Sequence, residues 1–192
     1  MAENWQAGGA ARKELEAKGE AGGLATILTG LGSLSYGELA GERMKLGLLL
    51  HDPEEEHDCF SDNTHNSHYY DQAGMVAIWN GSYTRVDGSK VEGLGIADLA
   101  AERTGDAKAK VDALLADTTA KLKAIKDSAD GGAMAYDQML AEGNEKGAAM
   151  VQAAVDALVA QTRGIEAVVG GIGVEIKVEG SDSLDDPSLV VQ

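Results

Sequence analysis

Proline is almost absent from this chain of 192 residues, and that absence restricts the fold more than any other feature. The sequence contains only Pro53 and Pro187. Because proline breaks the interior of a helix, the long stretch between these two positions permits uninterrupted helices. Only 4% of the residues are aromatic, so the core must consist mainly of aliphatic side chains. These residues favour helix over sheet, and we therefore predict an all-α protein.

Apolar residues recur at helical spacing in four long segments. We expect helices at residues 22–50, 59–80, 106–129 and 145–169. A long connection at 81–105, which contains a short helix at 96–103, joins the second long helix to the third. Another short helix is expected at 133–143. The predicted fold is an antiparallel four-helix bundle with short extra helices and a long connection between the second and third helices.

The two ends of the chain differ from this helical body. Residues 1–20 are predicted to form a solvated lead-in with a short charged helix, and residues 21–173 form the bundle. Residues 174–192 begin in an extended conformation and continue as an acidic, mobile tail. A chain of this length is expected to form a single domain.

The net charge of −16 limits the partners of the protein. Nucleic acids and anionic membranes require a positive surface, so neither is expected to bind, whereas cations are natural partners. Solubility alone also accounts for such acidity. No apolar run approaches the roughly 20 residues of a membrane span, and residues 1–20 lack the pattern of a signal peptide.

Two acidic residues continue the apolar stripe of the first predicted helix. The leucine and isoleucine residues between 24 and 34 recur at helical spacing, and the same steps lead to Glu38 and Glu42. We therefore predict that both carboxylates point toward the core, where Arg43, Lys45 or a metal ion must compensate their charge. The alternative is that they rotate out to water or pair with arginine.

A second stripe on this helix consists of small residues, namely Gly30, Ser33, Gly37 and Gly41. Small side chains leave room for close packing. We therefore expect the backbone of a neighbouring helix to approach the first helix along this stripe.

All four histidines of the chain lie between residues 51 and 71. His65 and His68 are three residues apart on one face of the second predicted helix, so their imidazoles can reach one ion. A carboxylate from Glu38 or Glu42 would complete the type of histidine and glutamate set that helical bundles use for transition metals. We therefore predict a site for a first-row transition metal formed by Glu38, Glu42, His65 and His68.

Further polar residues near this predicted site are candidates for supporting roles. They are Arg43, His57, Ser61, Asp62, Asn63 and Asp71. Capping of the second helix explains Asp62 and Asn63 equally well. His57 lies between two acidic residues, which strengthen its hold on a proton, so it is either a pH-sensitive link or a solvated loop histidine.

Three stretches of the sequence resemble those of a known family. They are GSLSYGELAGERM at residues 32–44, EEEHDCFSDNTH at 54–65 and GSDSLDDP at 180–187. They resemble the imelysin-like proteins, also called iron-regulated protein A or insulin-cleaving metalloprotease-like proteins, and the resemblance covers nearly the whole chain. It implies an all-helical protein of two similar lobes, exported to the periplasm or cell envelope, often lipid-anchored, and associated with iron supply.

The hallmark of this family, Gly-x-His-x-x-Glu in the N-terminal lobe, has no counterpart here. His51 follows Leu49 and Leu50 rather than Gly-x. The chain therefore looks like a C-terminal lobe alone, without half of the site that the family is thought to form between its lobes. A peptidase activity has been attributed to the family, and the missing motif argues against that activity in this chain.

These observations give one preferred hypothesis and two alternatives. The preferred hypothesis is an imelysin-like cell-envelope protein that binds a divalent metal ion in iron acquisition, with a separate N-terminal lobe or a second copy as partner. One alternative is a metallopeptidase fragment that uses a zinc-bound water. The other is a structural helical bundle in which the polar cluster only fixes the packing.

Overall fold

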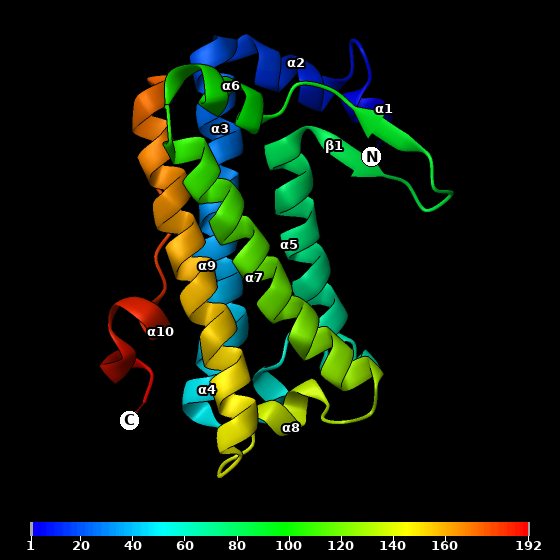
Figure 1. The fold of residues 1–192 in the computed structure, drawn as a ribbon, viewed down its shortest axis with the longest axis vertical. Helices are drawn as coiled ribbons and strands as arrows, with labels where there is room; N and C mark the ends of the chain where they lie inside the picture. The colour runs from blue at the N-terminus through cyan, green and yellow to red at the C-terminus, as the bar shows by residue number, and fades with distance from the viewer. Residues whose placement is uncertain (1, 192) are drawn as a thin grey trace.

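Four long helical segments run lengthwise through the molecule (Figure 1). The computed structural model describes residues 2–191. The long segments are α3 (Gly19–Ser33) continued by η1 (Leu34–Lys45) and α4 (Leu46–Leu50), then α5 (Thr64–Asn80), α7 (Ala107–Asp130) and α9 (Glu145–Ile172). Successive segments run in alternate directions, α9 packs against α7 and η1, and α5 packs against α7. The predominance of helix confirms the all-α prediction.

Short elements connect and flank the long segments. They are α1 (Ala2–Trp5), α2 (Ala10–Ala17), η2 (Pro53–Glu55), η3 (Cys59–Ser61), α6 (Ile96–Arg103), α8 (Tyr136–Leu140), α10 (Asp182–Asp185) and η4 (Pro187–Leu189). The helix predicted at 96–103 is therefore present with the expected bounds, whereas the helix predicted at 133–143 is limited to α8. The side chains of α1 and α2 are mostly exposed.

A β-hairpin occupies part of the connection in which we expected only a helix. Strand β1 (Ser82–Thr84) pairs antiparallel with β2 (Lys90–Glu92), and Tyr83 lies opposite Val91. The turn passes through Gly88, whose φ of 83° favours glycine. The hairpin projects away from the long helices beside the end of α5 (Figure 1). Its strands are short and largely exposed, so they lack the buried alternating pattern that predicts a strand.

The middle of the first long segment, η1, is a π-helix of 12 residues. Its backbone hydrogen bonds reach five residues back instead of four, which widens each turn. The buried residues of η1 are Ser35, Tyr36, Gly37, Leu39, Ala40, Gly41 and Met44. Glu38 and Glu42 are exposed, so the prediction that they point toward the core is wrong. The prediction failed because it extended α-helical spacing into a segment with a different period.

The C-terminal segment, rather than a neighbouring helix, fills the small-residue stripe of η1. A Cβ atom built at Gly37 would lie 2.8 Å from the carbonyl oxygen of Glu179. A Cβ atom at Gly41 would lie 2.3 Å from the Cβ atom of Ser181. Ser181 is 5% exposed and Ser183 is 1% exposed. The part of the C-terminal segment around Ser181 is therefore packed on η1, which differs from the mobile tail expected there, whereas residues 185–189 are exposed.

The replacement of Gly41 by alanine tests this close approach. We expect Gly41→Ala to lower the free energy of unfolding by about 1–3 kcal/mol, because its methyl group would overlap Ser181. The matched control is Gly30→Ala on α3, where a Cβ atom meets nothing within 4 Å. In this control the free energy of unfolding should rise by up to about 1 kcal/mol, because alanine has a higher helix propensity than glycine. Urea unfolding followed by circular dichroism measures the free energy of unfolding of both variants. Equal changes in the two variants would contradict the close contact between Gly41 and Ser181.

Candidate functional site

Helix α5 begins at Thr64, later than the start that we predicted near residue 59. The residues before it form the separate 3-10 turn η3, which ends where Asp62 adopts a left-handed conformation with a φ of 48°. Asn63 occupies the N-cap position, but its side chain accepts no hydrogen bond from the backbone of the helix. Instead its Oδ1 accepts a hydrogen bond from Asn66 Nδ2 over 2.9 Å. Side-chain capping therefore does not explain the polar residues at this helix start.

Asp58 ties the loop to the first turn of α5. Its carboxylate accepts hydrogen bonds from the hydroxyl groups of Ser61 at 3.0 Å and Ser67 at 2.8 Å. Its backbone N–H donates to Thr64 Oγ1 at 3.0 Å. The hydrogen bonds from Ser67 and Ser61 lower the pKa of Asp58. Ser61, a predicted site residue, thus serves to hold this loop in place.

The four predicted metal ligands have separate surroundings. Glu38 accepts hydrogen bonds from Arg43, and Glu42 accepts one from Ser181 Oγ at 2.6 Å. His65 Nε2 lies 3.1 Å from Asp130 Oδ1. Within residues 2–191, no three or more His, Cys, Asp and Glu side chains are grouped so that they could hold a metal ion. The two histidines and the two glutamates are therefore not assembled into one ligand set.

Arg43 links η1 to α5 through two carboxylates. Its Nη2 lies 2.7 Å from Glu38 Oε1, and its Nη1 lies 2.8 Å from Asp71 Oδ2. Glu38 and Arg43 are five residues apart, the spacing that the wide turn of a π-helix brings together. Burial raises the pKa of Asp71 above its ordinary value, and the positive charge of Arg43 reverses only part of this rise. This arrangement matches the alternative in which Glu38 pairs with arginine.

A fully buried chain of polar side chains joins three of the long segments. Gln72 on α5 and Gln161 on α9 exchange two amide hydrogen bonds, of 2.8 Å and 3.1 Å. Gln161 Nε2 also donates to Ser35 Oγ on η1 at 3.1 Å. All three side chains are 0% exposed. Because each of these side chains has hydrogen-bond partners, the network fixes the relative positions of α5, α9 and η1.

Buried polar atoms without partners gather around the start of α5. In the described part of the chain they are Glu56 Oε2, His65 Nδ1, both ring nitrogens of His68 and the hydroxyl of Tyr136. The His68 ring packs edge-on against the Tyr136 ring, with 5.0 Å between centroids. Buried polar atoms normally bind a protein group, a water molecule or an ion. These unpaired atoms lie toward the end of the molecule that holds α4 and α8 (Figure 1).

His68 is uncharged at neutral pH. Burial is the main cause that lowers its pKa, from 6.5 to about 3, and the positive charge of Arg43 acts in the same direction. A neutral imidazole is the form that binds metal ions. Burial also raises the pKa of Tyr136, assisted by the negative charge of Glu56. His57, in contrast, is exposed on the loop, in agreement with a solvated histidine.

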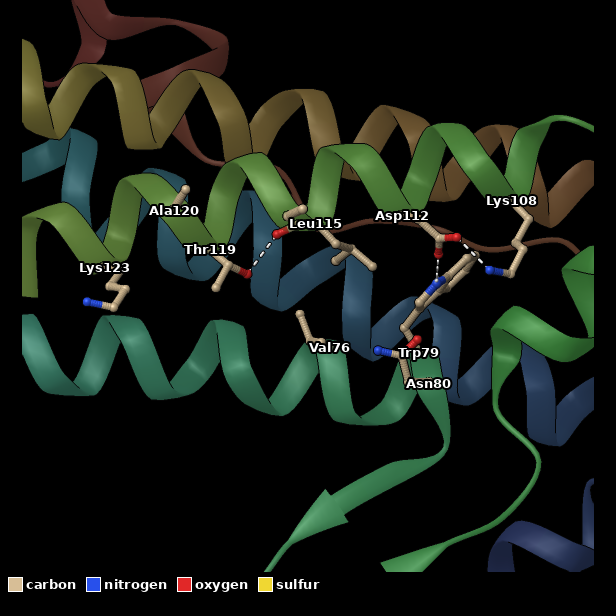
Figure 2. Close-up of a pocket in the computed structure, with 10 residues that line it drawn as sticks. Val76, Trp79, Asn80, Lys108, Asp112, Leu115, Thr119, Ala120 and Lys123 are labelled. Atoms are coloured by element: carbon tan, nitrogen blue, oxygen red, sulfur yellow. Dashed lines mark hydrogen bonds and ion pairs between the residues drawn. The ribbon is translucent and has the colours of Figure 1, made fainter.

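A second region, between α5 and α7, contains none of the predicted site residues (Figure 2). It is a cavity of about 500 Å³ near the C-terminal end of α5. The Trp79 indole N–H donates to Asp112 Oδ1 at 2.8 Å, and Lys108 Nζ lies 2.5 Å from the other carboxylate oxygen. The buried indole of Trp79 thus has a hydrogen-bond partner, and the carboxylate of Asp112 has a positive charge beside it. The polar groups of Trp79 and Asp112 are therefore paired within the protein, unlike the ring nitrogens of His68.

Comparison with protein families agrees with the resemblance seen in the sequence. The model of the imelysin family, peptidase M75, matches residues 1–165. The chain belongs to the imelysin family. The match includes the two motifs of this imelysin-family chain at 32–44 and 54–65, which form η1 and the loop before α5. No curated protein sequence matches the chain.

None of the helices in residues 2–191 of this imelysin-family chain combines the length and the apolar character that a membrane crossing requires. The motif at 54–65 contains Glu56 and His65, and His68 follows it by one helical turn. Sequence reasoning identified both histidines but missed Glu56 and Tyr136. Glu56 lies in an acidic loop, outside any helical stripe. Tyr136 shares a buried face of α8 with Met139 and Leu140, so periodicity marks it as a core residue and not as a site residue.

The low pKa of His68 predicts loss of stability in mild acid. Below pH 6.5 the unfolded chain binds a proton at His68, whereas the folded chain does so only near pH 3, so acid favours unfolding. As the pH falls from 6.5 to 5, we expect this residue to lower the free energy of unfolding by up to about 1.4 kcal/mol per pH unit. Urea unfolding at several pH values measures the slope, which His68→Gln should reduce.

His57→Gln is the matched control for this measurement, because it removes an exposed histidine from the neighbouring loop. It should leave the slope close to that of the unmodified chain. An equal slope in His68→Gln and the unmodified chain would show that His68 does not resist protonation in the folded state.

Proposed function

We propose that this imelysin-family chain is a periplasmic or cell-envelope protein that binds a metal ion, iron or zinc, in iron acquisition. One observation carries the metal-binding part of the proposal. The fully buried His68 leaves both ring nitrogens without a partner, close to the unpaired hydroxyl of Tyr136. Imidazole nitrogen is a common ligand of both metals, and tyrosine oxygen also binds iron.

His68, His65 and Tyr136 are the residues of this chain that fit such an ion. The unpaired Nδ1 of His65 comes from the same buried face of α5, and Tyr136 comes from α8. This set has fewer than the four ligands of a closed structural zinc site. We expect water, a separate N-terminal lobe or a second copy of the chain to supply the rest. Glu38 and Glu42 are not included in this proposed ligand set, because their carboxylates already accept hydrogen bonds from Arg43 and Ser181.

Burial of the site favours binding over peptide hydrolysis. A catalytic metal must keep a position open for water and substrate. His68 is 0% exposed, so a peptide bond has no access to an ion bound at this residue in the described conformation. The metallopeptidase alternative is therefore the less favoured one.

The purely structural alternative also explains less. In the antiparallel four-helix bundle that we propose for the long segments, the hydrogen-bonded chain of Ser35, Gln72 and Gln161 already fixes the packing. A purely structural role in fixing the helix packing therefore explains these three residues, but it gives no function to the unpaired atoms of His68 and Tyr136.

Thermal unfolding of the chelator-treated chain with Fe(II), Zn(II) or Mn(II) tests the metal site. An ion that binds only the folded state raises the free energy of unfolding by about 2.7 kcal/mol when its concentration is one hundred times its dissociation constant. For a chain of this size, the melting temperature should rise by about 5–10 °C. His68→Gln should abolish this rise, whereas His57→Gln should keep it.

The rise is compared within each variant, with and without metal, because His68→Gln can lower the melting temperature by itself. A metal-dependent rise that survives in both His68→Gln and His65→Gln would place the ion elsewhere. No rise with any of the three ions would refute metal binding at this site.

A further inference from the structure

A small acidic cavity lies beside the loop that precedes α5. It has a volume of about 290 Å³ and is lined by Pro53, Glu54, Glu56, Cys59, Asp62 and Asp137. The loop from η2 to the residue after η3 contributes most of the lining, and α8 contributes Asp137. Four of these six side chains are carboxylic acids, so the cavity concentrates negative charge from two separate parts of the chain.

These four acids lack compensating charges. Among residues 2–191, no lysine, arginine or histidine lies within ion-pair distance of Glu54, Glu56, Asp62 or Asp137. The acids of α7 differ, because each of them pairs with a lysine one helical turn away, as Asp127 does with Lys123. A cation from outside the chain is therefore the natural counter-charge for this cavity.

Glu56 provides the second, independent sign of a ligand. The residue is only 7% exposed, it lines the cavity, and its Oε2 atom has no hydrogen-bond partner. Burial raises its pKa, the nearby Thr64 hydroxyl lowers it in part, and the negative charges of Asp137 and Asp62 raise it further. Leaving a buried carboxylate unpaired is costly, and a bound cation would remove that cost.

The geometry favours an organic cation over a bare metal ion. The acids of this cavity are not grouped as the ligands of one metal, since no such group of three occurs within residues 2–191. An aliphatic polyamine instead carries ammonium groups several ångströms apart, each of which can bind a different carboxylate. The volume of about 290 Å³ lies just below the usual range for drug-sized ligands, which suits a smaller organic molecule.

We propose that this cavity binds a small aliphatic diamine or polyamine. One ammonium group pairs with the buried carboxylate of Glu56, and the other pairs with Glu54, Asp62 or Asp137. The site uses none of the residues proposed above to bind iron or zinc, so it is a separate function of the chain.

Isothermal titration calorimetry of the full chain with 1,4-diaminobutane at pH 7.5 and low salt tests the proposal. We expect one saturable site, with at least tenfold weaker binding of butylamine, which has a single ammonium group. Glu56→Gln should weaken diamine binding at least tenfold. Glu102→Gln is the matched control, since it removes the same charge from an exposed position on α6 and should leave the affinity unchanged.

A second variant covers the risk that Glu56→Gln disturbs the loop. Asp62→Asn removes one carboxylate from the cavity at an exposed position, and asparagine tolerates the left-handed conformation found there. This variant should fold normally and bind the diamine several-fold more weakly. The absence of saturable binding in the unmodified chain would overturn the proposal. Equal weakening by Glu102→Gln and by the two cavity variants would also overturn it, because it would assign binding to the overall negative charge.

Discussion

The wide turn of η1 is the constraint on which the surrounding contacts depend. Because its hydrogen bonds span five residues, Glu38 faces Arg43 and forms an ion pair with it. The same turn directs Ser35 toward α9, where its hydroxyl donates to the carbonyl oxygen of Leu158. It also presents Gly37 and Gly41 to the C-terminal segment. A regular α-helix of this sequence would distribute these side chains over other faces, so one local feature of the backbone organises contacts within η1, with α9 and with the C-terminal segment.

Most of the regular helices could be predicted from the sequence, and each of the two exceptions has its own cause. Helices α5, α6, α7 and α9 follow the spacing of their aliphatic residues and end at glycines or at similar turn signals, which are local properties. The π-helix is different, because its sequence carries the same apolar spacing as the α-helix before it and gives no local sign of the wider turn. The hairpin of β1 and β2 was missed because short exposed strands carry no burial pattern.

The same distinction applies to the candidate site. The buried face of α5, with His65 and His68, could be predicted because α5 is a regular α-helix. Burial of Glu38 and Glu42 was predicted wrongly, because they lie in η1. Glu56 and Tyr136 acquire their importance only through tertiary contacts, since a loop and a short helix bring them beside α5. In this protein, sequence periodicity thus predicts the histidines of the polar region but not the residues that surround them.

Packing of the C-terminal segment on η1 has a consequence for the order in which the fold is completed. Ser181 contacts Glu42, 139 residues earlier in the chain. During synthesis η1 leaves the ribosome long before Ser181 does, so the glycine face of η1 remains uncovered while α5, α7 and α9 are made. Contacts between such distant residues also slow folding, because a large loop must close before they form. The contacts that complete the packing of the first long segment are thus among the last that the growing chain can make.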